Sequence, residues 1–277
     1  MQTERYFCNI NKTKGSDMMI PQLDYYYMDD AVVAFSTTRV GGCSKGNYAE
    51  FNINRYCGDD EEDIRRNREA LCGLLGIGTD RLLMPHQVHL AETALVDEAL
   101  LKHSETERLQ LLDGYDALMT NVAGVCIGVS TADCIPLLLC DVEHHAVCAI
   151  HAGWRGTVAH IAEHAVAAMA AAYGTRPSRL KAQIGPGISL KSFEVGDEVY
   201  QKFSSAGFDM SVISQREEKW HIDLPECNRR QLMVSGLPAQ AIQVSGVCTF
   251  QQSDRYFSAR KLGIRSGRIF TGIMLRE

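Results

Sequence analysis

The sequence predicts an α+β fold, an α/β sandwich around a mixed and largely antiparallel β-sheet, in a single domain. First, several apolar segments follow one another between residues 92 and 151 with only short turns between them, which is typical of antiparallel pairing. Second, the helical segments flank this run instead of alternating with it, which disfavours a repeating βαβ chain. Third, the 277 residues are 45% hydrophobic, and neither an internal repeat nor a low-complexity linker divides them.

Each expected element is an apolar or periodic segment bounded by turn residues. Strands are expected at residues 31–38, 92–97, 115–120, 125–130, 135–140, 145–151, 180–185 and 240–247. Helices are expected at 61–75, which has an acidic first turn, and at 157–173, 196–204 and 224–235. The polar stretch 103–110 is expected to be a surface excursion. One domain is expected to cover residues 1–277, with residues 1–28 as a peripheral N-terminal segment.

The composition argues against two classes of partner. The formal net charge is −6 and Lys and Arg form no block, so we expect no nucleic-acid partner. No apolar run approaches the roughly 18 residues that cross a bilayer, so we expect no membrane association. The first ten residues do not read as a signal peptide, and the ten cysteines form no CxxC pair. A cytoplasmic location is therefore expected.

The segment HAGWRG, residues 151–156, places a histidine at the end of an apolar strand and before a glycine turn. His89 in PHQVHL and Cys134 in STADCIPLLL stand in similar positions. Two imidazoles and one thiolate suit a borderline-soft divalent ion such as zinc and leave one tetrahedral position open. The same atoms permit a Cys134 nucleophile with His151 as base and Asp133 or His89 as orienting group. The residues alone leave both interpretations open.

Several other polar residues are candidates for supporting roles. His86 or Asp133 is a candidate proton carrier, whereas His160 and His164 are interpreted as solvent-facing residues of a helix. An arginine beside a glycine turn can hold phosphate with its planar guanidinium group. The candidates for substrate or phosphate binding are Arg39, Arg68, Arg155 and Arg260. The aromatic residues that could stack on a ligand are Tyr48, Phe51, Trp154, Phe193 and Phe250.

A series of short motifs runs through nearly the whole chain. In order, they are FSTTRVGG, NINRYCGDD, NRE, HQVH, YDALMT, STADCIPLLL, HAGWRGT, IGPGI, FEVGDEV, CTF and YFSARK. Together, these motifs resemble the YfiH-like family, also called laccase-domain or multicopper polyphenol oxidase proteins and associated with purine nucleoside phosphorylase activity. One departure is Leu90, which stands where many members have glycine and would alter the pocket beside His89.

The resemblance implies one zinc ion bound by His89, Cys134 and His151, with Arg39 and Arg155 close to it. Copper is the less expected ion, because a multicopper laccase needs many histidines, typically in HxH pairs. This chain has nine histidines and no HxH pair, so polyphenol oxidase activity is disfavoured.

The resemblance further implies a zinc-dependent purine nucleoside phosphorylase that converts adenosine, inosine or guanosine and phosphate into base and ribose 1-phosphate. It also implies adenosine deamination and methylthioadenosine phosphorolysis, and zinc, which lowers the pKa of bound water to about 7, suits the deamination. The alternatives are an amide hydrolase acting on a cell-wall precursor, as in peptidoglycan editing, and a non-catalytic metal-binding protein. The expected partners are a nucleoside and phosphate, and the chain is expected to be a monomer or a homodimer.

Overall fold

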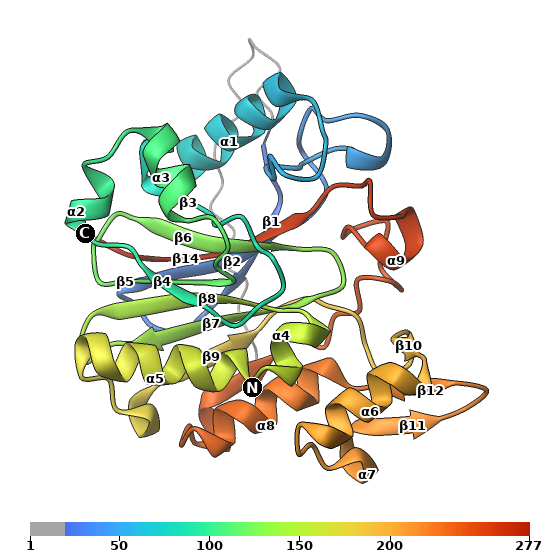
Figure 1. Ribbon diagram of the computed structural model, residues 1–277. Coiled ribbons are helices and arrows are strands. Elements are labelled where there is room, and N and C mark those ends of the chain that lie inside the picture. Colours follow the sequence, from blue (N-terminus) through green and yellow to red (C-terminus); the bar gives the residue numbers. More distant parts are fainter. Residues whose placement is uncertain (1–19) are drawn as a thin grey trace, which may run out of the picture.

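Two stacked β-sheets form the centre of the molecule, as the computed structural model of residues 20–277 shows (Figure 1). The five-stranded sheet has the order β1-β2-β14-β6-β3. Its strands are β1 (Leu23–Tyr26), β2 (Val32–Thr37), β14 (Ile269–Leu275), β6 (Cys126–Thr131) and β3 (Leu82–Leu83). All of its neighbouring strands are antiparallel except β3 and β6, which are parallel.

The six-stranded sheet has the order β13-β9-β7-β8-β5-β4. Its strands are β13 (Ile242–Val244), β9 (Lys181–Ile184), β7 (Ile135–Asp141), β8 (Ala146–Ala152), β5 (Ala117–Thr120) and β4 (Thr93–Leu95). Its two outermost pairs are parallel and the three inner pairs are antiparallel. The prediction of a mixed, largely antiparallel sheet in an α+β fold is confirmed, although the strands form two large sheets and not one.

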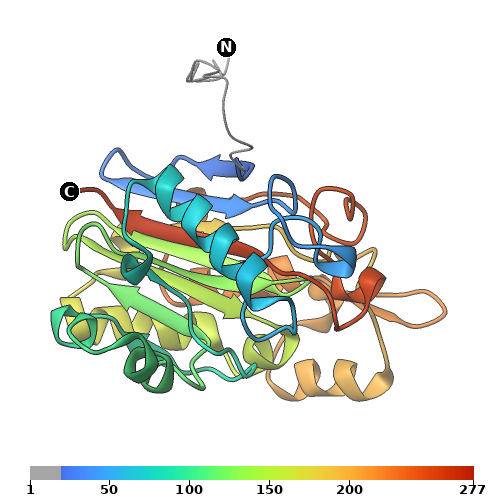
Figure 2. The same cartoon turned by 90° about the horizontal axis from the view of Figure 1, so that it is seen from above.

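Helices cover the outer face of each sheet. Helix α1 (Glu61–Leu75) crosses the five-stranded sheet, which Figure 2 shows from above. Helices α5 (Ile161–Tyr173) and α8 (Leu224–Val234) pack against the six-stranded sheet. The molecule is therefore a four-layer sandwich, with one helical layer outside each sheet.

Successive side chains of the inner strands enter different cores. In β7, Leu138 and Cys140 pack between the two sheets, whereas Leu137 and Leu139 face the helices. Strand β8 repeats this alternation, since Val147 belongs to the core between the sheets. Because both faces are buried, these strands are continuous apolar runs although their pairing is antiparallel.

Two elements differ from their prediction. The stretch 103–110, expected as a surface excursion, is mostly exposed but contains a helix that was not predicted, since α3 (Glu105–Leu111) begins there with a capping box between Ser104 and Glu107. The predicted helix 157–173 is two helices, α4 (Trp154–Val158) and α5, because the backbone of His160 between them takes a left-handed conformation with φ +58°.

The structure also contains elements that the prediction lacks. Strands β1, β3 and β14 complete the first sheet, and three short strands form a separate sheet: β10 (Glu194–Val195), β11 (Ser214–Arg216) and β12 (Trp220–Ile222). The additional short helices are α2 (Glu98–Leu101), α7 (Met210–Ile213) and α9 (Ala259–Leu262), while α6 (Asp197–Ser205) is close to a predicted helix. Of the segment 1–28 that was expected to be peripheral, residues 1–19 lie outside the described residues, and Leu23–Tyr26 forms an edge strand.

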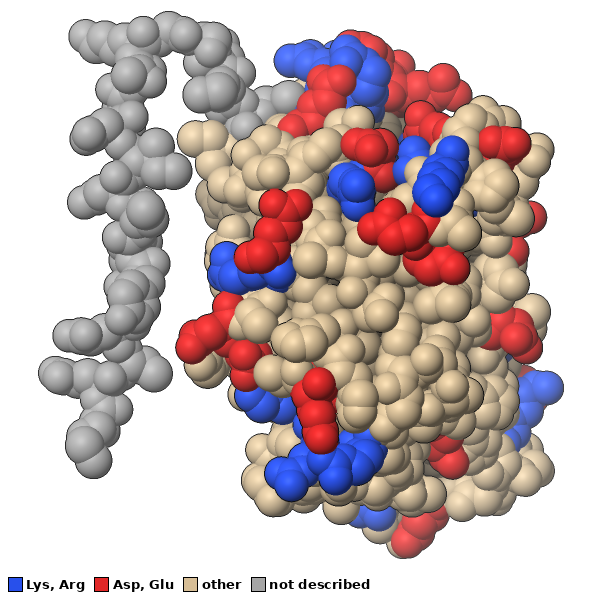
Figure 3. Space-filling view, turned by 90° about the vertical axis from the view of Figure 1, so that its left-hand side faces the viewer, with Lys and Arg blue, Asp and Glu red and all other residues tan. Residues whose placement is uncertain are grey.

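The surface carries charges of both signs. On the face shown in Figure 3, Lys and Arg side chains alternate with Asp and Glu around a broad uncharged area. Within residues 20–277, no helix has the length and apolar character needed to cross a membrane.

Candidate metal centre

Three side chains from distant parts of the chain converge at one end of the sandwich. His151 lies in β8, Cys134 directly precedes β7, and His89 lies in the loop between β3 and β4. Their candidate ligand atoms all lie within 4.8 Å of one another, and Cys134 Sγ is 3.9 Å from His89 Nε2. Their exposure is graded, since His151 is buried, Cys134 is half-buried and His89 is exposed. The structure thus brings together the three residues that the sequence suggested, with a route from solvent to them.

A buried carboxylate, Asp116, organises this cluster and was missed in the sequence analysis. Its Oδ1 lies 2.7 Å from His151 Nδ1, and it accepts hydrogen bonds from the backbone N–H groups of His89 (3.0 Å) and Leu90 (2.7 Å). The bond to Nδ1 leaves His151 Nε2 to face the cluster. A carboxylate that fixes a ligand histidine in this way is typical of metal sites. The available signal was a lone acidic residue within the apolar stretch YDALMT.

The loop that carries His89 has an unusual backbone conformation. His89 has φ +64°, a left-handed value that non-glycine residues adopt rarely. Asp116 holds three consecutive N–H groups of this loop, those of Val88, His89 and Leu90. We infer that these hydrogen bonds offset the backbone strain at His89.

Gly153 forms the floor of the cluster. A Cβ atom at this position would lie 3.0 Å from His89 Cδ2 and 3.1 Å from Cys134 Sγ. The backbone of Gly153 has φ −68°, so the requirement for glycine is one of space and not of conformation. The absence of a side chain leaves a small cradle between the three candidate ligands. Two imidazole nitrogens and one sulfur around such a cradle suit zinc with one position open.

Replacing Gly153 with alanine is expected to weaken metal binding roughly tenfold and to destabilise the protein by about 1–3 kcal/mol, because the methyl group overfills the cradle. Equilibrium dialysis with zinc and thermal unfolding measure the two effects. Gly73→Ala is the matched control, since nothing lies within 4 Å of its Cβ position in α1. That control is expected to stabilise the helix. A Gly153→Ala protein with unchanged zinc affinity would contradict the cradle.

Electrostatics favour a thiolate at Cys134. Burial raises the pKa of the Cys134 thiol, but the charge and hydrogen bonds of His151 and His89 outweigh it and lower the pKa to about 6. For His151, burial lowers the pKa, whereas Cys134 and Asp116 raise it. The pKa of His151 therefore lies above its usual value. A thiolate beside two imidazoles is the ionisation state in which a thiol binds a metal ion.

In protein stripped of metal, Cys134 is expected to react with iodoacetamide at a rate that rises as the pH passes through about 6 and then levels off. Cys43 is the internal control, because burial raises the pKa of its thiol to about 11. Peptide mass spectrometry after timed labelling at pH 5, 6 and 7 measures both rates. If Cys134 reacts no faster than Cys43 at pH 7, the thiolate assignment is wrong.

Asp133 and Arg260 lie in contact beside the cluster. Asp133 precedes Cys134, and its carboxylate accepts hydrogen bonds from Thr249 Oγ1 (2.8 Å) and from the backbone N–H of Arg260 (2.7 Å). The exposed guanidinium of Arg260 donates to the carbonyl of Glu194 at 3.1 Å. In this arrangement Asp133 ties the start of α9 to the loop of the cysteine, which places Arg260 near the cluster.

Arg155 and Arg39 differ in whether their guanidinium groups are occupied by hydrogen bonds within the protein. Arg155 follows the HAG turn, is exposed, and lies with its guanidinium 4.2 Å from the ring centre of Trp154. Arg39 is half-buried, because its guanidinium donates to the carbonyls of Ala49 (2.8 Å) and Ser253 (2.7 Å) and lies over Phe257. Arg155 is therefore available for a ligand, whereas Arg39 holds two loops together.

Arg68 and His86 are not among the candidate ligands of the cluster. Arg68 lines a cavity to which none of the three candidate ligands contributes. His86 stacks on Tyr56 with ring centres 4.3 Å apart, and its Nδ1 lies 2.6 Å from Asp113 Oδ1.

The remaining candidates are two histidines of the helical segment and the aromatic residues. His164 is exposed, and His160 contacts Glu163 and the carbonyl of Ala206, so neither belongs to the cluster. Of the aromatic candidates, Phe51 is fully buried, whereas Trp154 and Phe250 are partly exposed.

The fold and the cluster define a class of protein, a two-sheet sandwich with a candidate His, Cys and His metal centre at one end. The family described as "Multi-copper polyphenol oxidoreductase laccase" matches residues 33–276. The chain belongs to this family, which is the laccase-like or YfiH family that its motifs resemble.

Two relatives with assigned functions cover most of the chain. A purine nucleoside phosphorylase of Bacteroides thetaiotaomicron is 47% identical over 246 residues, which are 88% of this chain and 91% of that protein. "Adenosine deaminase RL5" from an unknown prokaryotic organism is 41% identical over 257 residues, 92% of this chain and 98% of that protein.

Among solved structures, YlmD from Geobacillus stearothermophilus matches with a TM-score of 0.83 and 31% identity, over 90% of this chain and 93% of that one. The hypothetical protein YfiH of Bacillus licheniformis has the same TM-score at 27% identity, over 88% of this chain and 93% of that one. The fold is therefore that of the YfiH and YlmD structures.

Proposed function

We propose that this protein is a zinc-dependent purine nucleoside phosphorylase, acting on adenosine, inosine, guanosine and methylthioadenosine, and that it also deaminates adenosine. The observation that carries the proposal is the cluster of His89, Cys134 and His151, preorganised by Asp116 and with one side open to solvent. The names of the relatives support the choice of reaction, since one is a purine nucleoside phosphorylase and another is an adenosine deaminase.

A zinc ion held by His89, Cys134 and His151 would act as a Lewis acid that polarises oxygen atoms of substrate or phosphate. The residues of the chain hold and orient the reactants. Arg155 and Arg260 are the proposed phosphate-binding residues, because both are exposed, Arg155 after the turn that follows His151 and Arg260 in the segment bound by Asp133. Trp154 and Phe250 supply partly exposed aromatic rings that can contact a purine base.

In the proposed phosphorolysis, a phosphate oxygen forms a bond to the anomeric carbon of the ribose, and the bond from that carbon to the purine nitrogen breaks. The electron pair of the broken bond stays on the purine, which takes up a proton. We propose His86 as the proton carrier, since Asp113 binds its Nδ1 and Nε2 has no protein partner among residues 20–277. Asp133 is the weaker candidate, because its carboxylate oxygens already accept hydrogen bonds from Thr249 and from the backbone of Arg260.

An oxidase with a three-copper centre is disfavoured by the placement of the histidines. All nine lie within residues 20–277, and only His89 and His151 belong to a group of potential metal ligands in that part of the chain. No further histidines gather for a cluster that reduces oxygen.

The test is an assay of zinc-loaded protein with inosine, with and without inorganic phosphate, combined with metal analysis. We expect hypoxanthine and ribose 1-phosphate only when phosphate is present, and ammonia from adenosine without any need for phosphate. His164→Ala is the matched control for His151→Ala, because His164 is exposed and lies outside the cluster. Zinc-loaded protein that releases no hypoxanthine would refute phosphorolysis, and cleavage of a cell-wall amide would favour the hydrolase alternative.

A further inference from the structure

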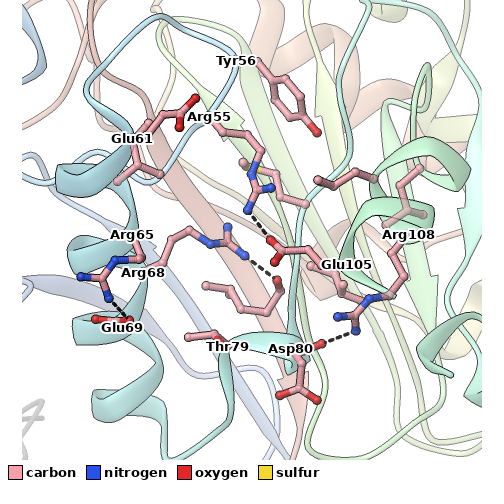
Figure 4. A pocket seen from close by; sticks show the side chains of 16 residues that line it. Arg55, Tyr56, Glu61, Arg65, Arg68, Glu69, Thr79, Asp80, Glu105 and Arg108 are labelled. Atoms are coloured by element: carbon pink, nitrogen blue, oxygen red, sulfur yellow. Dashed lines mark hydrogen bonds and ion pairs between the residues drawn. The ribbon is translucent and has the colours of Figure 1, made fainter. Parts of the chain in front are cut away.

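A second site lies between α1, α3 and β3, away from the metal centre. It is a cavity of about 610 Å³, a volume typical of small-molecule sites. Three arginines from separate segments, Arg55, Arg68 and Arg108, contribute to its lining. Figure 4 shows the guanidinium groups of Arg55 and Arg68 beside the carboxylate of Glu105, with Arg108 on the other side. We call this site the arginine pocket, defined by these four residues.

One of the three arginines of the pocket pairs with a carboxylate, and the other two bind backbone carbonyls. Arg55 Nη2 forms an ion pair with Glu105 Oε1 at 2.8 Å. Arg68 and Arg108 have no carboxylate within ion-pair distance in residues 20–277, and each donates to a backbone carbonyl, of Leu82 (3.0 Å) and Asp80 (2.7 Å). Around Glu105, three guanidinium groups therefore face one carboxylate, while the whole lining holds four arginines and four acidic residues.

Arg108 supplies an unsatisfied donor in this pocket. The residue is only 8% exposed, and its Nε is buried without a hydrogen-bond partner among the described residues. A buried guanidinium N–H without an acceptor is costly, so Arg108 gains a hydrogen bond if a ligand draws its side chain toward the pocket. Burial also lowers the pKa of the Arg68 guanidinium.

The remaining lining separates into an apolar wall and an exposed rim. The wall consists of Ile64, Leu82, Leu83, Met84, Leu109 and Leu112. At the rim, Arg65 pairs with Glu62 and Glu69, and Glu61 and Asp80 are exposed. The ligand that fits has an anionic head group for the three guanidinium groups and an apolar body for the wall.

We propose that the arginine pocket binds a phosphate monoester with an apolar or aromatic body, at a site distinct from the metal centre. A phosphate monoester carries close to two negative charges at pH 7 and accepts the paired N–H groups of guanidinium. A carboxylate offers two oxygen atoms to these guanidinium groups, whereas a phosphate monoester offers three, and the cavity is larger than inorganic phosphate requires. The site does not depend on the proposed phosphorylase activity, because none of its residues belongs to the metal cluster.

The test is isothermal titration calorimetry of zinc-loaded full-length protein with phenyl phosphate, compared with benzoate and inorganic phosphate. Phenyl phosphate is expected to bind saturably and at least about tenfold more tightly than either compound, because benzoate lacks the phosphate group and inorganic phosphate lacks the apolar body. Arg68→Gln is expected to weaken it about tenfold. Glu105→Gln is expected to tighten it severalfold, because the competing carboxylate is removed. Arg66→Gln is the control on the exposed side of the same helix.

The opposite directions of the two variants separate binding from misfolding, since loss of fold cannot produce the gain expected of Glu105→Gln. Binding that neither variant changes would come from phosphate at the metal centre and would overturn the proposal. An absence of saturable binding up to about 10 mM would overturn it as well. Neither result alters the inosine assay, so this proposal and the phosphorylase proposal can fail separately.

Discussion

The Cys134→Ala protein is expected to remain folded, to lose bound zinc, and to lose phosphorolysis by about a thousandfold or more. Two imidazoles alone are an incomplete ligand set, and a lost Lewis acid removes several kcal/mol of charge stabilisation, about tenfold in rate for each 1.4 kcal/mol. The cost in stability is small, because Cys134 is half-buried and precedes its strand. Metal analysis, circular dichroism and release of hypoxanthine from inosine measure the three quantities.

Cys43→Ala is the matched control for this variant. Cys43 is also half-buried, but it lies outside the metal cluster. Its replacement is expected to leave zinc content and turnover unchanged. Cys134→Ala protein with a full complement of zinc would refute the ligand assignment, and loss of zinc with full turnover would favour a non-catalytic metal site.

The Asp116→Asn protein is expected to bind zinc about 10–100-fold more weakly than the unmodified protein. An asparagine amide keeps one acceptor oxygen but turns an N–H₂ group toward donors, whereas the carboxylate of Asp116 accepts from both His151 and the His89 loop. The unfolding free energy is expected to fall by about 1–3 kcal/mol, the cost of unsatisfied buried donors. Competition with a chelator and denaturant unfolding measure the two effects.

Asp113→Asn serves as the control for Asp116→Asn. Asp113 is an exposed carboxylate that also contacts a histidine, His86, but it does not touch the cluster. The Asp113→Asn variant is expected to leave zinc affinity unchanged and to slow phosphorolysis, because His86 is the proposed proton carrier. Equal zinc affinities for the two variants would show that Asp116 does not organise the site.

Some elements of the fold were predictable because their ends carry strong local signals. Helix α1 was predicted with its observed bounds, since Asp60 accepts from two N–H groups at its start and Gly76 ends it in a left-handed conformation. Helix α3 carried a similar signal, the capping box of Ser104 and Glu107, but the polar stretch 103–110 was interpreted only as a surface excursion. The break at His160 had no clear signal, because apolar periodicity continues across it.

Other features depend on contacts that no local pattern specifies. Strand β14 lies at the centre of its sheet between β2 and β6, although the three are far apart in sequence. Asp116 reaches His151 across 35 residues and the His89 loop across 27, so its role follows from the pairing of β5 with β8. For the same reason, the sequence could suggest Arg68 as an anion-binding residue but could not show that it faces a cavity of its own.

The hydrogen bonds of Asp116 have a consequence for how the protein acquires its metal. They fix the ring of His151 and the backbone of the His89 loop through protein atoms alone, and the stacked sheets hold the strand ends in place. The ion is therefore not needed to drive folding, in contrast to zinc fingers, which are unfolded without it. If the proposed zinc site is correct, the chain completes its fold first and loads the ion afterwards, so that metal supply in the cell governs how much of the protein is active and not how much survives.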